Sequence, residues 1–134
     1  MAEAPILIDV SATGDAGYAT AFLEGLDHPT MVCNGPGEGN LCPILEGFRC
    51  DMVDSARGIV FELDLDEPQH RAILKQYVKI VAEDVPIRVV IRPGQEVTYA
   101  EALVGVRWWT HQPTVGELDG FAAEVEAASA AAED

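Results

Sequence analysis

The chain has 134 residues, of which 49% are hydrophobic, and its formal net charge at pH 7 is −15. A chain of this length and composition folds as one domain with a substantial core, which excludes intrinsic disorder and a two-domain organisation. Lysine and arginine together number only 8. They are too few and too scattered to neutralise the phosphates of DNA or RNA, so we expect no nucleic-acid partner.

The sequence contains no segment that would direct the chain into a membrane. It has no run of about 18 apolar residues, and its first residues, MAEAPILIDV, lack the basic start and long apolar stretch of a signal peptide. The odd number of cysteines, 3, fits a reducing compartment better than a disulfide framework. We therefore expect a cytoplasmic protein.

Short apolar runs alternate with helical patterns in the first half of the chain. Strands are predicted over 5–10 and 30–33, and the spacing of Tyr18, Phe22 and Leu26 predicts a helix over 15–26 between them. A loop rich in glycine and proline, NGPGEGN, follows the second strand. The next segment, LCPILEGFRC, has room for one or two helical turns.

The second half of the chain continues the alternation. Strands are predicted over 58–65, 87–91 and 106–110. An acidic cap followed by Pro68 predicts the start of a helix that runs to about residue 83, and a shorter helix is predicted over 96–103. Thr114 and Glu117 have the spacing of a capping box at the start of the last helix.

Five strands alternating with five helices predict a doubly wound α/β fold, in which a five-stranded parallel sheet lies between helical layers. We expect a single domain over 1–134, with its core over about 5–127 and an acidic, alanine-rich tail over 128–134 that frays. Ligands of such folds bind beyond the carboxyl ends of the strands. Asp9, Asp64, Arg92 and His111 are predicted to lie at or near those ends.

Over most of its length the chain resembles the receiver domain of two-component response regulators, a flavodoxin-like three-layer sandwich. Three segments carry this resemblance. VFELDLDEP is similar to the third strand of that family, with Asp64 at the phosphoacceptor position, VPIRVVI is similar to the fourth strand, and WWTHQPTVGELDGF is similar to the fifth strand and last helix. The resemblance implies that an acidic pair after the first strand binds Mg²⁺ and that a histidine kinase phosphorylates Asp64.

The residues that handle the phosphoryl group in that family are altered in this chain. Only Asp9, followed by Val10, stands where two acidic residues are expected, so Asp9 and Asp64 are what remains of a Mg²⁺ site. Arg92 stands at the position of a Ser or Thr, and Gln112 stands where the family has a lysine. The chain therefore resembles an atypical receiver, or pseudo-receiver, in which phosphorylation is slow or absent.

Several polar residues near the strand ends have expected partners. If Arg92 lies level with Asp64, it pairs with this carboxylate, lowers its pKa and fixes one conformation without phosphate. The alternative interpretation of Asp64 is a solvated strand-end residue or a helix cap. Arg88 is the expected cross-strand partner of Glu62. His111 is expected to bond Asp64 or the neighbours of Arg92, whereas His70 is expected on an exposed helix turn.

Three cysteines, Cys33, Cys42 and Cys50, flank a loop that is longer than receivers usually have. Three thiolates close in space can hold Zn²⁺ with His28 or a carboxylate as the fourth ligand, although zinc sites usually show cysteines paired roughly two to four residues apart. A Cys42–Cys50 pair can instead act as a redox switch. Buried or incidental cysteines are the third interpretation.

Together these patterns predict a stand-alone receiver-like signalling module that is not an enzyme and acts by protein–protein interaction without standard phosphorylation. Its acidic surface favours a basic protein partner. The alternatives are a phosphoacceptor that takes its phosphoryl group from a histidine kinase at Asp64, and a cysteine-based metal or redox sensor. From the resemblance, a homodimer is expected to use Trp108 or Trp109, of which Trp109 holds the aromatic position of the fifth strand.

Overall fold

The computed structural model describes residues 4–10, 17–35, 42–81 and 83–133, with side chains described as far as residue 130. In these ranges no helix is long and apolar enough to cross a membrane. The elements in chain order are β1 (Ile6–Val10), α1 (Gly17–Gly25), β2 (Thr30–Cys33), α2 (Asp51–Ser55), β3 (Gly58–Glu62), α3 (Pro68–Ile80), β4 (Ile87–Val90), α4 (Gln95–Thr98), the 3₁₀ helix η1 (Ala100–Leu103), β5 (Arg107–Trp109) and α5 (Val115–Glu133).

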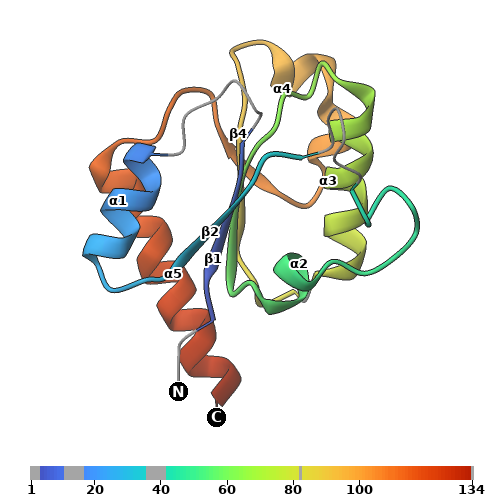
Figure 1. The fold of residues 1–134 in the computed structure, drawn as a ribbon. Coiled ribbons are helices and arrows are strands. Elements are labelled where there is room, and N and C mark those ends of the chain that lie inside the picture. The colour runs from blue at the N-terminus through green and yellow to red at the C-terminus, as the bar shows by residue number, and fades with distance from the viewer. Residues whose placement is uncertain (1–3, 11–16, 36–41, 82, 134) are drawn as a thin grey trace.

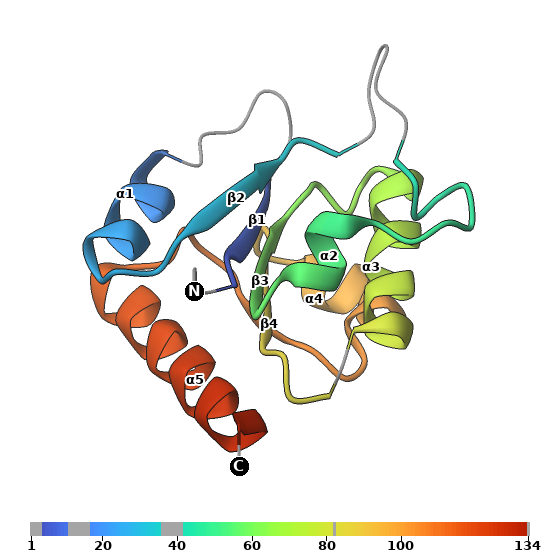
Figure 2. The same ribbon diagram turned by 60° about the horizontal axis from the view of Figure 1, so that its bottom comes forward.

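The strands form one sheet in the order β2-β1-β3-β4-β5, and each neighbouring pair is parallel. Helices α1 and α5 cover one face of this sheet, and α2, α3 and α4 cover the other (Figure 1 and Figure 2). Parallel neighbours need crossover connections, and these connections place helices on both faces. The predicted doubly wound, flavodoxin-like fold with a five-stranded parallel sheet is confirmed.

The core is built by the central strands, whose side chains point alternately into two apolar layers. Leu7 and Phe61 face α2 and α3, whereas Ile6 and Val60 face α1 and α5. β1 and β3 are therefore apolar on both faces, as expected for strands that are covered on both sides. Phe61 also meets Tyr77 of α3 edge to face, with the ring centroids 5.7 Å apart.

Local sequence signals position the last helix. Thr114 Oγ1 accepts a hydrogen bond from the Glu117 N–H (3.2 Å), and Glu117 Oε1 accepts one from the Thr114 N–H (2.9 Å), so the predicted capping box is confirmed. Gly58 at the start of β3 lets α5 approach the sheet closely. A Cβ at this position would lie 2.6 Å from Val125 Cγ2, so a larger residue would push the helix away.

Three helical segments differ from their predictions. The helix predicted over 96–103 is divided into α4 and η1, with Tyr99 between them. Residues 43–47 form turns, and α2 begins only at Asp51. The tail predicted to fray continues α5 to Glu133, because an alanine-rich sequence retains a high helix propensity.

Candidate functional site at the carboxyl edge of the sheet

Asp64 lies just beyond the end of β3, at the carboxyl edge of the sheet, which is uppermost in Figure 1. Its Oδ1 accepts hydrogen bonds from the Asp66 N–H (3.0 Å), Arg92 Nη2 (3.1 Å) and Gln95 Nε2 (3.3 Å). The side chain is 40% exposed. The hypothesised contact between Arg92 and Asp64 is therefore present, and one oxygen of Asp64 already has three donors.

Asp66 is a second carboxylate of this site, although its sequence context indicated only a helix start. Arg92 Nη2 donates to its Oδ2, and Gln95 Nε2 (3.2 Å) and the Tyr99 hydroxyl (2.7 Å) donate to its Oδ1. The hydrogen bond from Tyr99 contributes most to lowering the pKa of the Asp66 carboxyl, and the one from Gln95 is the next largest contribution. The hydrogen bond between Tyr99 and Asp66 also raises the pKa of the Tyr99 hydroxyl. We call this set the Arg92 network: Asp64, Asp66, Arg92, Gln95 and Tyr99.

Gln95 holds the network together from the first position of α4. Its side chain is buried, and its Oε1 accepts the backbone N–H of Arg92 (2.8 Å) while its Nε2 donates to both carboxylates. The turn that places it depends on Gly94, whose φ of 98° lies in the left-handed region that glycine adopts without strain. The only sequence signal for this arrangement is the Pro-Gly turn after β4.

Helix α3 fixes the backbone on the other side of Asp64. His70, expected to be exposed, is buried, and its Nδ1–H donates to the carbonyl oxygen of Asp64 (2.9 Å). Because a carbonyl oxygen only accepts, the proton of this ring lies on Nδ1. One residue further, Arg71 Nη1 donates to the Leu65 carbonyl oxygen (2.6 Å). Two side chains of α3 therefore hold the Asp64 loop in one conformation.

Asp9 does not reach the edge where Asp64 lies. It is fully buried inside β1 and pairs in register with Phe61, three residues before Asp64, which corresponds to about 10 Å along the strand. Neither of its carboxyl oxygens has a hydrogen-bond partner in the described part of the chain. Burial raises the pKa of Asp9 from 3.8 to about 7, and the nearby Tyr77 hydroxyl and Cys33 thiol offset only part of this effect.

The residues expected to hold Mg²⁺ therefore do not fit a metal ion. Asp9 is buried below the edge, and the adjacent Val10 is buried as well. The remaining carboxylate, Asp64, shares the guanidinium of Arg92 with Asp66. Within the described ranges no group of three or more His, Cys, Asp or Glu side chains is arranged to hold a metal ion. The predicted role of Asp9 in a metal site is therefore corrected, because Asp9 is buried in the sheet below the edge where Asp64 lies.

Gln112, at the position of the family's lysine, lies at the same edge and donates from Nε2 to Glu62 Oε1. The expected Glu62–Arg88 pair is wrong: Arg88 lies on the same face of the sheet as Glu62, but it is level with Val60 and pairs with Glu124 of α5. The expected bond from His111 to the Asp64 site is wrong as well. The Nε2 of His111 lies 2.8 Å from Glu117 Oε1, at the start of α5.

A cleft at the carboxyl edge of the sheet joins these groups. Its volume is about 360 Å³. The polar side chains that line it come from the ends of β3, β4 and β5 and from the start of α4: Glu62, Asp64, Arg92, Gln95, Thr110, His111 and Gln112. In this cleft the guanidinium of Arg92, which already pairs with Asp64, lies together with the polar side chains of the neighbouring strand ends.

The two tryptophans have different surroundings. Trp109 is buried and packs edge to face on Phe121 of α5, with the ring centroids 6.4 Å apart. Trp108 is 41% exposed. Of the two candidates for a homodimer interface, only Trp108 presents surface, because successive residues of a strand point to opposite faces.

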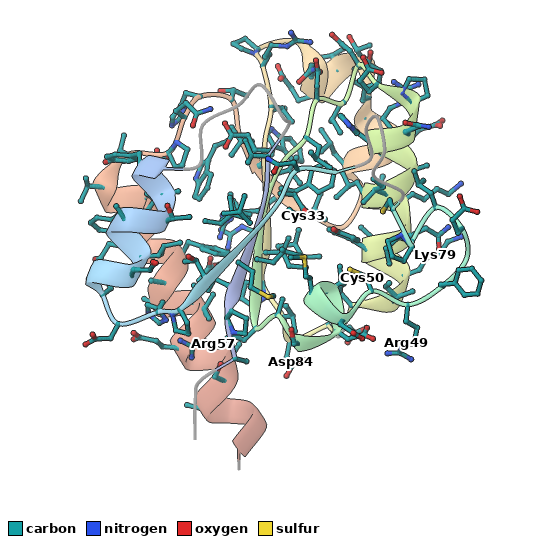
Figure 3. The ribbon with its side chains drawn as sticks, viewed as in Figure 1. Cys33, Arg49, Cys50, Arg57, Lys79 and Asp84 are labelled. Atoms are coloured by element: carbon teal, nitrogen blue, oxygen red, sulfur yellow. The ribbon has the colours of Figure 1, made fainter. Side chains whose placement is uncertain are left out.

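The three cysteines line one cavity of about 520 Å³ together with Tyr77, and none is in a disulfide. Figure 3 shows Cys33 and Cys50 on the face of the sheet that α2 and α3 cover. Burial raises the pKa of Cys33, a hydrogen bond with the Gly35 backbone offsets part of this effect, and the nearby Asp9 carboxylate adds to it. The thiol is therefore protonated at neutral pH, which makes it a poor nucleophile.

His28 is not a neighbour of these cysteines. It precedes β2, whereas Cys33 ends this strand, a separation of roughly 16 Å. The His28 ring is buried and bonds Arg57 and Glu126 of α5, with 2.9 Å between Nε2 and Glu126 Oε1. The expectation that His28 completes a zinc site is therefore wrong.

The sheet order, the layers and the polar carboxyl edge define a flavodoxin-like α/β domain. No protein-family model and no curated protein matches the sequence. Among solved structures, this fold is that of response-regulator receiver domains. A CheY-like receiver domain protein from Methanospirillum hungatei JF-1 aligns with a TM-score of 0.62 at 14% identity, over 95% of this chain and 97% of that chain.

Two further structures of similar size share the fold. A response regulator protein from Burkholderia multivorans aligns with a TM-score of 0.60 at 15% identity, over 91% of this chain and 94% of that one. An adenylate cyclase structure from Rhodopirellula baltica aligns with a TM-score of 0.61 at 13% identity, over 98% of this chain and 93% of that one. At these identities the comparisons establish the fold and leave function to the residues of the site.

Proposed function

We propose that this chain is a receiver-like signalling module that acts through contacts with other proteins, is not an enzyme, and is not phosphorylated at Asp64 in the standard way. The single observation that carries the proposal is the Arg92 network. A guanidinium bridges Asp64 and Asp66 at the edge where a receiver would need a metal ion and a reactive carboxylate.

The network opposes phosphorylation for electrostatic and geometric reasons. Oδ1 of Asp64 accepts from three donors, so its lone pairs are engaged before a phosphodonor arrives. The charge that a transferred phosphoryl group brings must be neutralised by cations and donors. Here Gln112 is neutral and bonded to Glu62, and Asp9 is too deep to contribute to a metal site.

The same network supplies a fixed conformation. It joins the loop after β3 to the first turn of α4, because Asp64 and Asp66 lie on one side and Arg92, Gln95 and Tyr99 on the other. Because Arg92 contacts both carboxylates, it would hold the α4 segment in one position, as a phosphoryl group on Asp64 would in a phosphorylated receiver. The module would therefore present one surface to its partner without a phosphorylation cycle.

The test is the intact mass of the protein before and after incubation with Mg²⁺ and acetyl phosphate, with Asp64→Asn as the control. An unchanged mass for both proteins is the expected result. A phosphoryl adduct that forms on the wild type and not on Asp64→Asn would overturn the proposal in favour of a working phosphoacceptor. Arg92→Ser, tested in parallel, shows whether removal of the guanidinium restores the reaction.

The partner and the assembly are part of the proposal. With a net charge of −15, most of the surface is expected to meet a basic protein, and the affinity should fall as salt increases. Trp108, 41% exposed on the edge strand β5, is proposed as the centre of a homodimer contact, because exposed aromatic side chains are enriched at interfaces.

A second candidate function is a thiol-based sensor, favoured by the one cavity that all three cysteines line. In this candidate, an oxidant of the hydroperoxide class would accept two electrons from two of the thiols and leave a disulfide. Counting accessible thiols with Ellman's reagent in urea, before and after mild peroxide, decides the point. A loss of two thiols per chain supports the sensor, and an unchanged count rejects it.

A further inference from the structure

The described surface contains a groove whose charge is opposite to that of the chain as a whole. It has a volume of about 760 Å³ and lies between α3 and the α4–η1 segment. Its charged side chains are three cations, Arg71, Lys75 and Lys79, and a single carboxylate, Glu101. In a protein with 23 acidic and 8 basic residues, this local excess of positive charge is a distinct feature.

The cations form one stripe along α3, since Arg71, Lys75 and Lys79 are spaced four residues apart and lie on one face of the helix. Lys75 and Lys79 are exposed, and Figure 3 labels Lys79 on this helix. In the described part of the chain they are the only two of the 8 basic side chains without a hydrogen bond or ion pair.

The groove also exposes aliphatic side chains, two of them on the α4–η1 side, where Glu101 also lies. Val97 of α4 is 78% exposed and Val104, after η1, is 71% exposed, with Val78 of α3 contributing a third apolar side chain. Contiguous exposed apolar side chains mark protein-interaction surfaces, and here they line the same groove as the cations. A ligand that satisfies both kinds of side chain needs carboxylates as well as apolar side chains.

We propose that this α3–α4 groove binds an acidic, amphipathic peptide segment of a partner protein. The occupant would place Asp or Glu side chains against Lys75 and Lys79, and aliphatic or aromatic side chains against Val97 and Val104. Charge complementarity argues for this occupant. At physiological salt the screening length is about 8 Å, so a short segment senses the cations that line the groove more than the distant acidic surface.

The other occupants fit less well. A second copy of the chain is already assigned to the surface at Trp108, which does not line the groove. A nucleic acid needs more phosphate contacts than three cations can supply. The groove also exposes Val97 and Val104 beside its cations, unlike the convergent donors of a site for a small anion.

The inference rests on the proposed function, because it adds to the interaction module a second surface whose partner segment is acidic, in contrast to the basic partner expected for the rest of the surface. It does not depend on the chemistry of Asp64. A protein that is phosphorylated at Asp64 and also binds an acidic peptide in the groove would refute the proposed function and leave the groove in place, so the two proposals fail separately.

The experiment is selection of a random peptide library displayed on phage against the wild-type protein, followed by fluorescence anisotropy with a labelled peptide of the selected consensus. We expect a consensus rich in Asp and Glu with interspersed apolar residues. We expect the double substitution Lys75→Glu and Lys79→Glu to weaken binding of the labelled peptide by about tenfold or more, the ratio that two surface ion pairs supply. We also expect the wild type to bind the peptide more weakly as salt increases. Val97→Ser with Val104→Ser should weaken binding without changing the salt dependence.

The matched control is Arg49→Glu with Arg107→Glu, which changes the net charge by the same amount at two exposed arginines that do not line the groove. Urea unfolding of each variant confirms that it is folded. Selection of peptides without acidic residues, or equal weakening by the control variant, would overturn the proposal. So would sedimentation showing that the wild type forms a dimer that the two lysine substitutions dissociate, because a second copy would then occupy the groove.

Discussion

Asp9 gives the sharpest quantitative prediction, because its carboxyl group is fully buried and unpartnered and its pKa is about 7. Asp9→Asn replaces this group with an uncharged one of nearly the same shape. A pKa that moves from 3.8 in the unfolded chain to about 7 in the folded protein corresponds to about 4 kcal/mol. That is a large fraction of the roughly 5–15 kcal/mol by which small domains are stable.

The sign follows from proton binding. Below pH 3.8, Asp9 is protonated in both states and contributes no pH dependence. As the pH rises, the unfolded chain loses this proton first, while the folded protein keeps it until about pH 7. The folded state therefore binds more protons in this window, so the Asp9 share of the stability falls with rising pH and levels off above pH 7.

Urea unfolding of both proteins at several pH values between about 4 and 8 measures the effect. Groups common to both proteins cancel in the difference, and Cys33 and Tyr77 have raised pKa values that lie above this window. We expect the free energy of unfolding of Asp9→Asn, relative to wild type, to increase by up to about 4 kcal/mol from the lowest to the highest pH. A difference that is constant with pH would refute the reasoning, whatever its sign.

Further predictions concern the core, the Arg92 network and the assembly. Phe61→Ala removes a fully buried ring that packs on Tyr77 and should lower the free energy of unfolding by about 3–5 kcal/mol in urea; a loss below about 1 kcal/mol would contradict this packing. Tyr99→Phe removes the hydrogen bond that contributes most to the lowered pKa of Asp66. An NMR titration should therefore show this pKa rising towards its ordinary value, and an unchanged pKa would show that the contact between Tyr99 and Asp66 is absent. Trp108→Ala should convert the proposed homodimer to a monomer in sedimentation; a wild type that is monomeric throughout refutes the dimer.

The sequence was sufficient for the fold because the relevant signals are local. Strand β3 contains the apolar run IVF, the capping box at Thr114 and Glu117 depends on two residues three positions apart, and Pro68 starts α3. The proximity of Arg92 to Asp64 also followed from the fold, since the carboxyl ends of neighbouring parallel strands meet at one edge.

The depth of Asp9 could not be read in the same way. The pattern ILIDV fits a strand whether the aspartate ends it or lies inside it, and only the pairing of Asp9 with Phe61 decides between these. A carboxylate is rarely buried without a partner, so the pattern favoured the edge. Register is a property of two strands together, and no single segment of sequence contains it.

Side-chain partners across elements were predicted least well. Glu62 and Arg88 seemed natural partners across the sheet, yet Arg88 lies over the Trp109 ring, 5.3 Å from its centroid, and pairs with Glu124 of α5. Both side chains lie on the face that α1 and α5 cover, because Arg88 pairs in register with Val60 and Glu62 follows Val60 by two residues. The partner of Arg88 is set by where α5 lies on that face, and the strand pattern does not contain this information. The roles of Gln95 and Tyr99 had no signal in sequence because both depend on how α4 lies against the loop after β3.

Tyr99 connects the groove to the Asp64 site. Its ring lies under the guanidinium of Arg71, 4.7 Å from the guanidinium carbon, and lines the α3–α4 groove, while its hydroxyl donates to Asp66, which shares Arg92 with Asp64. A peptide in the groove and the Arg92 network therefore act on the same side chain. If the network fixes the position of α4, then Arg92→Ser should weaken peptide binding although Arg92 does not line the groove. Thermodynamic linkage then requires that bound peptide makes the Arg92 network harder to open. The free energy by which the intact network strengthens peptide binding must equal the free energy by which bound peptide stabilises the network.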